Sequence, residues 1–250
     1  MGLQIIPLNC GTIVIEKSTQ VYWRDFGKTI EIPSMCHVIK GGTKTILIDT
    51  SFLSIDQAKS GKHWNAKRTP DQELEAQLKQ AGFKPDDIDI VIFTHLHWDH
   101  AQNNRLFKKA KFLVRVEELR YAICPLPTQA IPYEAPVPPA NMIPIWIRDK
   151  TIFEPIYEDS EVIPGVFYFL TPGHTPGGAS IAVDTDEGKY VIAGDAINLY
   201  ENIELNLPGG QMYTQEDAVK SIRKILSVAS SPKHVLPGHE FGVFARKSYG

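Results

Sequence analysis

Cysteine is scarce in this chain of 250 residues, which has only Cys10, Cys36 and Cys124. Three widely spaced cysteines, an odd number, favour free thiols over a disulfide framework, and none of them belongs to a C-x-x-C pair that would hold a metal. Free thiols persist in a reducing compartment. We therefore expect the protein to work in the cytoplasm.

Long hydrophobic runs are also missing. No stretch approaches the roughly 20 apolar residues that cross a bilayer. The first seven residues, MGLQIIP, have neither the charged region nor the long apolar region of a secretion signal. The sequence predicts no association with a membrane.

The chain also lacks a large surplus of either positive or negative charge. The 26 basic and 29 acidic residues are interspersed and leave a net charge of −3. Because proteins that bind nucleic acids usually present a basic stripe to the phosphates, we expect no nucleic-acid partner. The 43% hydrophobic and 22% charged residues are those of a globular protein, and the length suits a single domain spanning residues 1–250.

Short runs rich in β-branched residues predict strands along most of the chain. Two amphipathic helices are expected, one from Thr69 to a stop at Gly82 and one that opens at Thr214. The elements form two comparable batches, one on each side of residues 124–144, which favours sheets packed face to face with helices outside. The predicted strands lie at 13–15, 36–39, 45–48, 90–93, 112–116, 165–170, 179–183, 190–193 and 234–236.

The segment 124–144, called here the proline-rich segment, carries seven prolines, which exclude a regular helix or a central strand. A structureless insertion of this length inside a domain is usually functional. We predict that it forms part of a pocket wall or lid, or the contact between two copies in a homodimer. The apolar side chains that need cover in either case are Ile131, Tyr133, Val137, Met142 and Ile143.

Histidine, by contrast, is concentrated at one place. Residues 94–100 read T-H-L-H-W-D-H and directly follow the apolar run 90–93. This pattern predicts a buried strand ending in a tight loop that points three imidazoles and one carboxylate into a small volume. Mixed nitrogen and carboxylate ligands suit zinc, and also iron, manganese or cobalt. The candidate ligands in the loop are His95, His97, Asp99 and His100.

Three further candidate ligands follow later strands. His174 lies in the turn T-P-G-H-T-P-G at 171–177, Asp195 follows Gly194, and His239 ends the tripeptide P-G-H. A neighbouring glycine lets the backbone approach closely, as a crowded ligand shell requires. The repeated pattern of strand end, glycine and ligand indicates one shared metal site.

In these motifs the chain resembles the metallo-β-lactamase superfamily. H-x-H-x-D-H at 95–100, G-H-T-P-G at 173–177, G-D at 194–195 and P-G-H at 237–239 match the superfamily in order and separation. Asp49-Thr50 matches the pair that closes an early strand there. The resemblance implies an α/β fold, α+β in some schemes, built as a four-layer αββα sandwich with a dinuclear metal site at one edge.

The resemblance also assigns the ligands to two divalent metal ions, which we expect to be zinc, with iron, manganese and cobalt as alternatives. His95, His97 and His174 would hold the first ion. Asp195 would bridge to the second ion, whose other ligands would be Asp99, His100 and His239.

Within the superfamily, the chain looks most similar to the N-acyl-homoserine lactone lactonases. This implies a hydrolase that opens a lactone ring and so quenches quorum signalling. Asp99 would then hand a proton to the expelled alkoxide, and Trp98 would line the pocket. The branch usually has a tyrosine three residues after the bridging aspartate, where this chain has Asn198; we expect Asn198 or the nearby Tyr200 to donate to the substrate carbonyl.

Several alternatives stay open from the sequence. Another cyclic ester or amide is a candidate substrate, and a glyoxalase-II-like thioesterase shares the ligands but adds a C-terminal helical region, for which the eleven residues after His239 leave no room. A non-catalytic metal-binding protein should have lost at least one ligand. Lactamases with a cysteine ligand, nucleases with a basic groove and di-iron proteins with Glu at the position of His97 fit the sequence less well. His37, His63 and His234 lie outside the motifs, and core or surface roles are expected for them.

Overall fold

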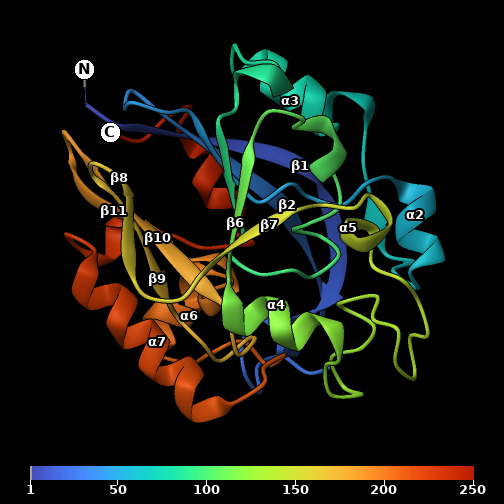
Figure 1. The fold of residues 1–250 in the computed structure, drawn as a ribbon. Helices are drawn as coiled ribbons and strands as arrows, with labels where there is room; N and C mark the ends of the chain where they lie inside the picture. Colours follow the sequence, from blue (N-terminus) through green and yellow to red (C-terminus); the bar gives the residue numbers. More distant parts are fainter. Residues whose placement is uncertain (1) are drawn as a thin grey trace.

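The computed structural model describes residues 2–250 and contains two β-sheets packed face to face (Figure 1). The first sheet has seven strands in the order β4-β1-β2-β3-β5-β6-β7. β1, β2 and β3 are antiparallel neighbours, whereas β3, β5, β6 and β7 run parallel. Its strands are β1 (Gln4–Glu16), β2 (Thr29–Lys40), β3 (Ile46–Ile48), β4 (Ala66–Lys67), β5 (Ile90–Ile92), β6 (Lys111–Arg115) and β7 (Phe153–Ile156).

The second sheet has five strands in the order β12-β11-β10-β9-β8. Its strands pair antiparallel except for the short last strand β12, which is parallel to β11. They are β8 (Ser160–Ile163), β9 (Val166–Leu170), β10 (Ala179–Thr185), β11 (Gly188–Ile192) and β12 (Val235–Leu236).

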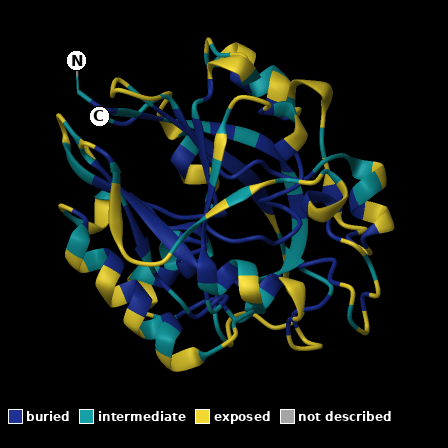
Figure 2. Ribbon diagram, viewed as in Figure 1, coloured by how far each residue is buried: buried dark blue, intermediate teal, exposed yellow. Residues whose placement is uncertain are grey.

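The period-two alternation of side chains gives each sheet two apolar faces. In β3, Ile46 and Ile48 lie in the core between the sheets, whereas Leu47 faces the opposite way. In β10, Ile181 points into the same inter-sheet core and Ala182 points outward. Both faces of both sheets are therefore buried, which requires an outer layer of helices on each side (Figure 2).

The helices provide those outer layers. α3 packs Leu74 and Leu78 against the first sheet, and α7 packs Ile222 and Ile225 against the second. The αββα sandwich expected from the sequence is thus confirmed. The helices are α1 (Lys17–Gln20), α2 (Ile55–Ser60), α3 (Leu74–Gln80), α4 (Val116–Ile123), α5 (Ile145–Arg148), α6 (Tyr200–Leu205) and α7 (Gln215–Val228).

The local sequence signals agree with the structure in most places. Thr69 and Gln72 form the expected capping box, although a 3-10 turn over Pro70–Gln72 precedes α3 itself. Gly82 follows α3 with a φ of +87°, which suits a glycine that ends a helix. The boundary between the two batches was placed wrongly, because β7 follows the proline-rich segment and still pairs with β6 in the first sheet.

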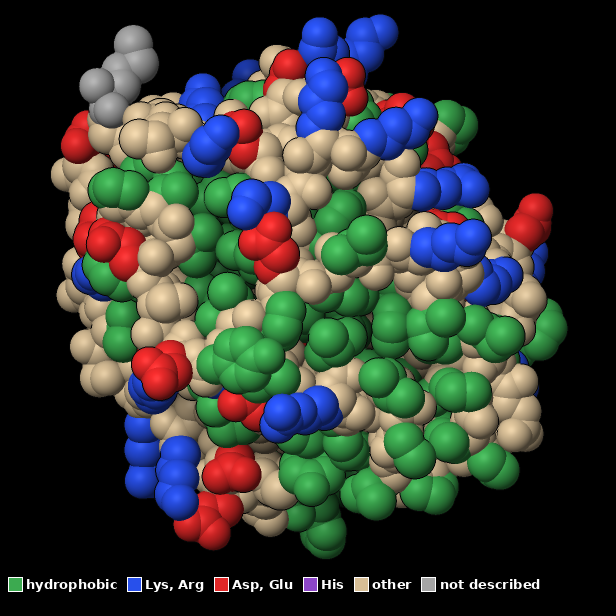
Figure 3. All heavy atoms as spheres, in the orientation of Figure 1, with side chains coloured by type: hydrophobic (Ala, Val, Ile, Leu, Met, Phe, Trp, Pro, Cys, Tyr) green, Lys and Arg blue, Asp and Glu red, His purple; other side chains and the backbone are tan. Residues whose placement is uncertain are grey.

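The proline-rich segment contains neither helix nor strand, as its prolines predicted. Its inner side is well packed: Tyr133 is buried, and the backbone of Trp98 donates to Pro132 O at 2.9 Å. Its outer side and the neighbouring helices are apolar, and Figure 3 shows hydrophobic side chains gathered where Figure 1 places α5. The predicted contact between two copies stays a prediction. The exposed large side chains from this part of the chain are Ile123, Leu126, Ile143, Ile147 and Ile152.

A buried carboxylate ties three loops together at one edge of the sandwich. Glu118 in α4 accepts hydrogen bonds from Leu96 N at 2.9 Å, Thr175 Oγ1 at 2.7 Å and Tyr133 OH at 2.6 Å. These partners belong to the histidine loop, the 171–177 turn and the proline-rich segment. Within residues 2–250, no helix combines the length and hydropathy needed to cross a membrane.

We predict that Gly177→Ala strongly destabilises the protein, because the new Cβ would overlap the Glu118 backbone and lie 2.5 Å from its Cβ. Overpacking against main chain that cannot move away should cost about 3 kcal/mol in the free energy of unfolding, measured by urea denaturation. Gly82→Ala is the control, since nothing lies within 4 Å of its Cβ and only the positive φ is penalised, by about 1–2 kcal/mol. Equal losses in the two variants would contradict this account.

Candidate metal centre

The candidate ligands lie just beyond the ends of strands from both sheets. The 94–100 loop follows β5, His174 follows β9, Asp195 follows β11, and His239 follows β12. Because these ends meet at one edge of the sandwich, loops distant in sequence approach each other. The structure brings the ligand atoms together in three overlapping groups, each within 4.8 Å: His95, His97 and His174; His95, His100 and Asp195; and Asp99, His100 and His239.

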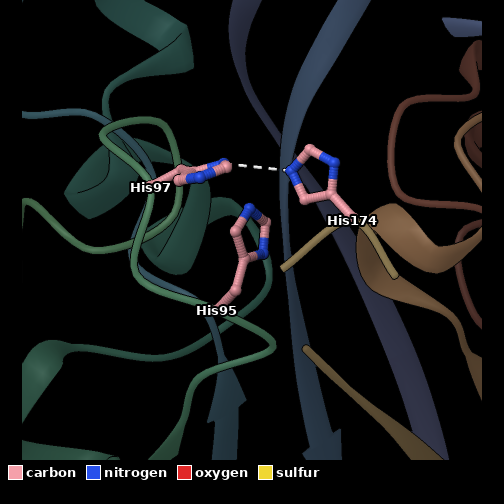
Figure 4. Close-up of side chains that lie close together, drawn as sticks. All are labelled: His95, His97 and His174. Carbon is pink, nitrogen blue, oxygen red and sulfur yellow. Dashed lines mark hydrogen bonds between the residues drawn. The ribbon is translucent and has the colours of Figure 1, made fainter. Parts of the chain in front are cut away.

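The first group consists of imidazoles alone, and Figure 4 shows their rings turned toward a common point. His174 Nε2 lies 3.0 Å from His97 Nδ1, and the ring centroids of His95 and His97 are 4.5 Å apart. The nitrogens that face away from this point have partners. His97 Nε2 lies 3.0 Å from Gln129 Oε1, and His174 Nδ1 lies 2.8 Å from Gln211 O.

The group of Asp99, His100 and His239 combines one carboxylate with two histidines. The outward nitrogen of His100 lies 2.8 Å from Asp49 Oδ2, and that of His239 lies 2.8 Å from Pro33 O. On the inner side, Asp99 Oδ2 is 3.6 Å from His100 Nε2 and 3.8 Å from His239 Nε2. Hydrogen bonds to the outward nitrogens fix the tautomer and the direction of metal-binding histidines.

Asp195 lies between the histidine group, which is His95, His97 and His174, and the group of Asp99, His100 and His239. Its Oδ2 is 3.5 Å from His174 Nε2 and 3.1 Å from His239 Nε2, and its Oδ1 is 3.4 Å from His100 Nε2. Burial would raise the pKa of Asp195, but the surrounding imidazoles hold this pKa well below its usual range. The carboxylate is therefore ionised and placed to contact cations on either side.

The donor set fits metal ions. His95 Nε2, His100 Nε2 and Asp195 Oδ1 are buried and have no hydrogen-bond partner among the described residues. Burial together with the neighbouring imidazoles lowers the pKa values of His95 and His97 well below the usual value, which leaves their rings neutral, as metal coordination requires. Unpaired buried atoms of this kind are costly unless a further partner, here a cation, satisfies them.

A cavity of about 330 Å³ opens over the ligands, and Trp98 lines it, as the sequence analysis expected. Three residues of the proline-rich segment form part of its wall: Thr128, Ile131 and Pro132. The other lining residues are Ile13, Ile15, Gln20, Ile32, His63, Asn65, His97, Asp99, His174, Asp195, Gln211 and His239.

Neither candidate for the carbonyl donor lines this cavity. Asn198 is buried, and its Nδ2 donates to Gln20 O at 3.4 Å. Tyr200 lines a separate depression with Ile203 and Lys233. The structure therefore does not bring Tyr200 to this cavity: the chain enters α6 at this residue, and Tyr200 packs against the inter-sheet core.

Sequence reasoning missed Gln20 and His63, which both face the cavity. His63 was expected to have only a core or surface role, and no motif surrounds either residue. Burial lowers the pKa of His63 to about 4, so its ring is neutral near pH 7. Their positions follow from tertiary packing, because Gln20 ends α1 and His63 lies in the loop after α2.

Comparison with models of known protein families shows which family this chain is related to. The model of the metallo-beta-lactamase superfamily matches residues 30–239, which include every candidate ligand. The chain belongs to the metallo-beta-lactamase superfamily. Its site therefore combines the fold of this superfamily with donors for two divalent metal ions.

Curated relatives within the superfamily include an N-acyl homoserine lactonase of Bacillus thuringiensis, 28% identical over 84% of this chain and 82% of the relative. An N-acyl homoserine lactonase of Bacillus cereus is 27% identical over 94% of this chain and 90% of the relative. Among solved structures, an N-acyl homoserine lactone hydrolase with N-hexanoyl-L-homoserine at its catalytic metal centre superposes with a TM-score of 0.78. That pair is 24% identical, and the match covers 98% of this chain and 96% of the other.

We predict that the purified protein, supplied with zinc, binds two metal ions per chain, because the ligand groups exceed what one tetrahedral ion can use. Asp195→Ala should lower the metal content below one ion per chain, since the carboxylate contacts both groups. Elemental analysis measures this. Asp89→Ala is the matched control. Asp89 lies just before β5, where its carboxylate accepts a hydrogen bond from Thr45 N, away from the ligands. One ion or none in the unaltered protein would rule out the dinuclear site.

Proposed function

We propose that this protein is a metal-dependent lactonase that hydrolyses the ester bond of N-acyl homoserine lactones and so quenches quorum signals. The observation that carries the proposal is the position of Asp195 between two ligand groups at the base of a small cavity. The curated relatives named as N-acyl homoserine lactonases support it across most of the chain. A cavity of about 330 Å³ suits a small molecule.

In this proposal, His95, His97 and His174 hold one ion, and Asp195 is shared with a second ion held by Asp99, His100 and His239. Zinc suits these nitrogen and carboxylate donors, and iron, manganese and cobalt are the alternatives. Two such ions, when bound, would supply a water that ionises near neutral pH and an electrophile for the carbonyl oxygen.

Asp99 is the residue proposed to move the proton. Ring opening breaks the bond between the carbonyl carbon and the ring oxygen, and the alkoxide that leaves must gain a proton. Asp99 lines the cavity and is about 8% exposed, so one carboxylate can face both the ligand group and the substrate. It receives the proton of the attacking water and passes it to the alkoxide.

Gln20 is the side chain proposed to donate to the substrate carbonyl. Gln20 lines the cavity, its Nε2 lies 3.3 Å from Thr19 Oγ1 and its Oε1 is buried without a partner; in this proposal the amide rotates so that its NH₂ group donates to the bound substrate. The Gln20 backbone is held in place, since Asn202 Nδ2 donates to its carbonyl at 2.9 Å and Asn198 Nδ2 at 3.4 Å. Asn198 thus acts through Gln20 and does not touch the substrate.

The apolar part of the wall is proposed to accept the acyl chain. Ile13, Ile15 and Ile32 come from β1 and β2, and Ile131 comes from the proline-rich segment. An acyl chain placed against these side chains would leave the lactone ring over Asp195. Apolar walls with a few polar groups at one end are usual for small-molecule sites.

A hydrolysis panel tests the function. The zinc-loaded protein should open N-acyl homoserine lactones faster than aromatic lactones, small cyclic amides or glutathione thioesters. Ring opening releases acid and can be followed with a pH indicator. Preferred turnover of the thioesters would replace the lactonase proposal with a glyoxalase-II-like one, and no turnover of any substrate by the metal-loaded protein would refute an enzymatic role.

We predict that Asp99→Asn lowers kcat by about 10²–10⁴, the range for losing a general acid–base group, because the amide cannot transfer a proton. KM should change much less. Metal content must be measured alongside, so that a lost ligand is not mistaken for a lost proton carrier. A normal kcat at full metal occupancy would disprove the proposed role.

We predict that Gln20→Glu, which keeps the size but removes the NH₂ donor, lowers kcat by about 10²-fold, as for the loss of one oxyanion donor. Asn65→Asp is the matched control, because Asn65 also lines the cavity but its amide donates to the backbone of Val14. Steady-state kinetics with one N-acyl homoserine lactone compares them. A Gln20→Glu variant with the kcat of the control would exclude this donor.

A further inference from the structure

A second pair of buried titratable side chains lies beside the metal ligands. His63 stacks face to face on Trp98, with ring centroids 4.0 Å apart and an interplanar angle of 7°. Its Nε2 points toward Glu134 Oε1 at 3.8 Å. Both residues are buried, and His63 also lines the cavity.

The pair is unusual because its polar atoms lack partners. His63 Nε2 and both carboxylate oxygens of Glu134 are buried without a hydrogen bond to any described residue. Glu134 sits at the turn of the proline-rich segment with a φ of +49°. Gly61 leaves room for the pair, since a Cβ there would collide with the Glu134 carboxylate and lie 2.9 Å from His63 Cδ2.

The chemistry of a neutral imidazole determines which ring nitrogen of His63 donates a hydrogen bond and which accepts one. A neutral histidine carries one proton, and an ionised carboxylate only accepts hydrogen bonds. Glu134 therefore favours the proton on His63 Nε2, the nearer nitrogen. Nδ1 lies on the opposite edge of the ring from the Cδ2–Nε2 edge that faces Gly61 and Glu134. Nδ1 is left as an acceptor, and His63 lines the cavity.

We propose that His63 Nδ1 accepts the amide N–H of an N-acyl lactone, and that Glu134 is the positioning residue that fixes the His63 tautomer. The proposal rests on the proposed lactonase function and names the substituent that this site selects. An N-acyl homoserine lactone carries one strong donor, its amide N–H, next to the ring carbon. A lactone without this donor leaves a buried acceptor unpaired, which costs binding energy.

The stacking on Trp98 makes this acceptor rigid. Trp98 lies between the ligands His97 and Asp99, and its backbone is held by Pro132 O at 2.9 Å. The position of the imidazole is thus coupled to the ligand loop through a parallel ring contact. An acceptor fixed in this way selects the orientation of the substrate as well as its composition.

The test compares two substrates on the zinc-loaded protein: N-hexanoyl homoserine lactone and its analogue with an ester oxygen in place of the amide NH. Wild type should prefer the amide by about tenfold in kcat/KM, the value of one hydrogen bond to a buried acceptor. In His63→Phe, which keeps an aromatic ring over Trp98, the preference should fall to about one. His63→Asn places an oxygen near the position of Nδ1 and should retain most of it.

His37→Phe is the matched control, because His37 is a buried histidine of β2 with an unpaired Nε2 that does not line the cavity. Its preference for the amide should equal that of wild type. A His63→Phe variant with the wild-type preference, or a wild type that treats both lactones alike, would overturn the proposal while leaving the lactonase function standing.

A spectroscopic test does not depend on turnover. In ¹⁵N spectra of the zinc-loaded protein, with the His63→Phe spectrum as the assignment reference, His63 should be protonated at Nε2. Adding N-hexanoyl homoserine, the ring-opened product, should shift the Nδ1 resonance. Glu134→Leu should mix the two tautomers and weaken the preference between substrates. A proton on Nδ1 in wild type would refute the proposal even if no lactone is hydrolysed.

Discussion

The site depends on one buried carboxylate that is not a ligand. Glu118 accepts hydrogen bonds from three loops that come from both sheets and from the proline-rich segment. Burial raises its pKa, and these hydrogen bonds oppose that shift by favouring the ionised form. Losing any one of these hydrogen bonds would leave the buried charge of Glu118 with fewer partners, so the three loops are held together. Gly177 has no side chain because α4 must approach closely enough to deliver this carboxylate.

The crowding of the imidazoles is a second constraint. The rings of His100 and His174 lie 4.0 and 4.9 Å from the His95 ring, and burial together with these neighbours lowers the pKa of His95. Each of the five rings has a partner at its outward nitrogen: the Thr94 hydroxyl, Asp49, Gln129, the Gln211 carbonyl or the Pro33 carbonyl. The inner nitrogens therefore point at the same volume before any cation arrives. The fold thus bears the entropic cost of assembling the site, and a bound metal ion would supply the partners that the buried atoms lack.

The sequence predicted those parts of the structure that are encoded locally. Ligands at strand ends beside glycine, the alternating strands and the capped helix at Thr69 follow from short-range chemistry, and the structure contains them. β7 and β8 were not predicted, because each is four residues long and contains charged or proline residues. Gln20 and His63 were not predicted to line the cavity, because packing between segments distant in sequence brings them there. Tyr200, expected near the substrate from its spacing after Asp195, begins α6 and lines a separate depression.

The site therefore has two parts: the proposed metal ligands, which local sequence patterns predict, and the cavity wall, which forms through tertiary packing. The proposed metal ligands lie on short turns just after β5, β9, β11 and β12, where pairing of the strands restricts the backbone. The cavity wall comes from elsewhere: β1 and β2, the loop after α2, and the proline-rich segment. Such segments can change without disturbing the strand ends, so substrate choice can vary while the chemistry is kept. Gln20, His63 and Glu134 all lie outside the turns that carry the proposed ligands, and a motif search is least able to find residues there.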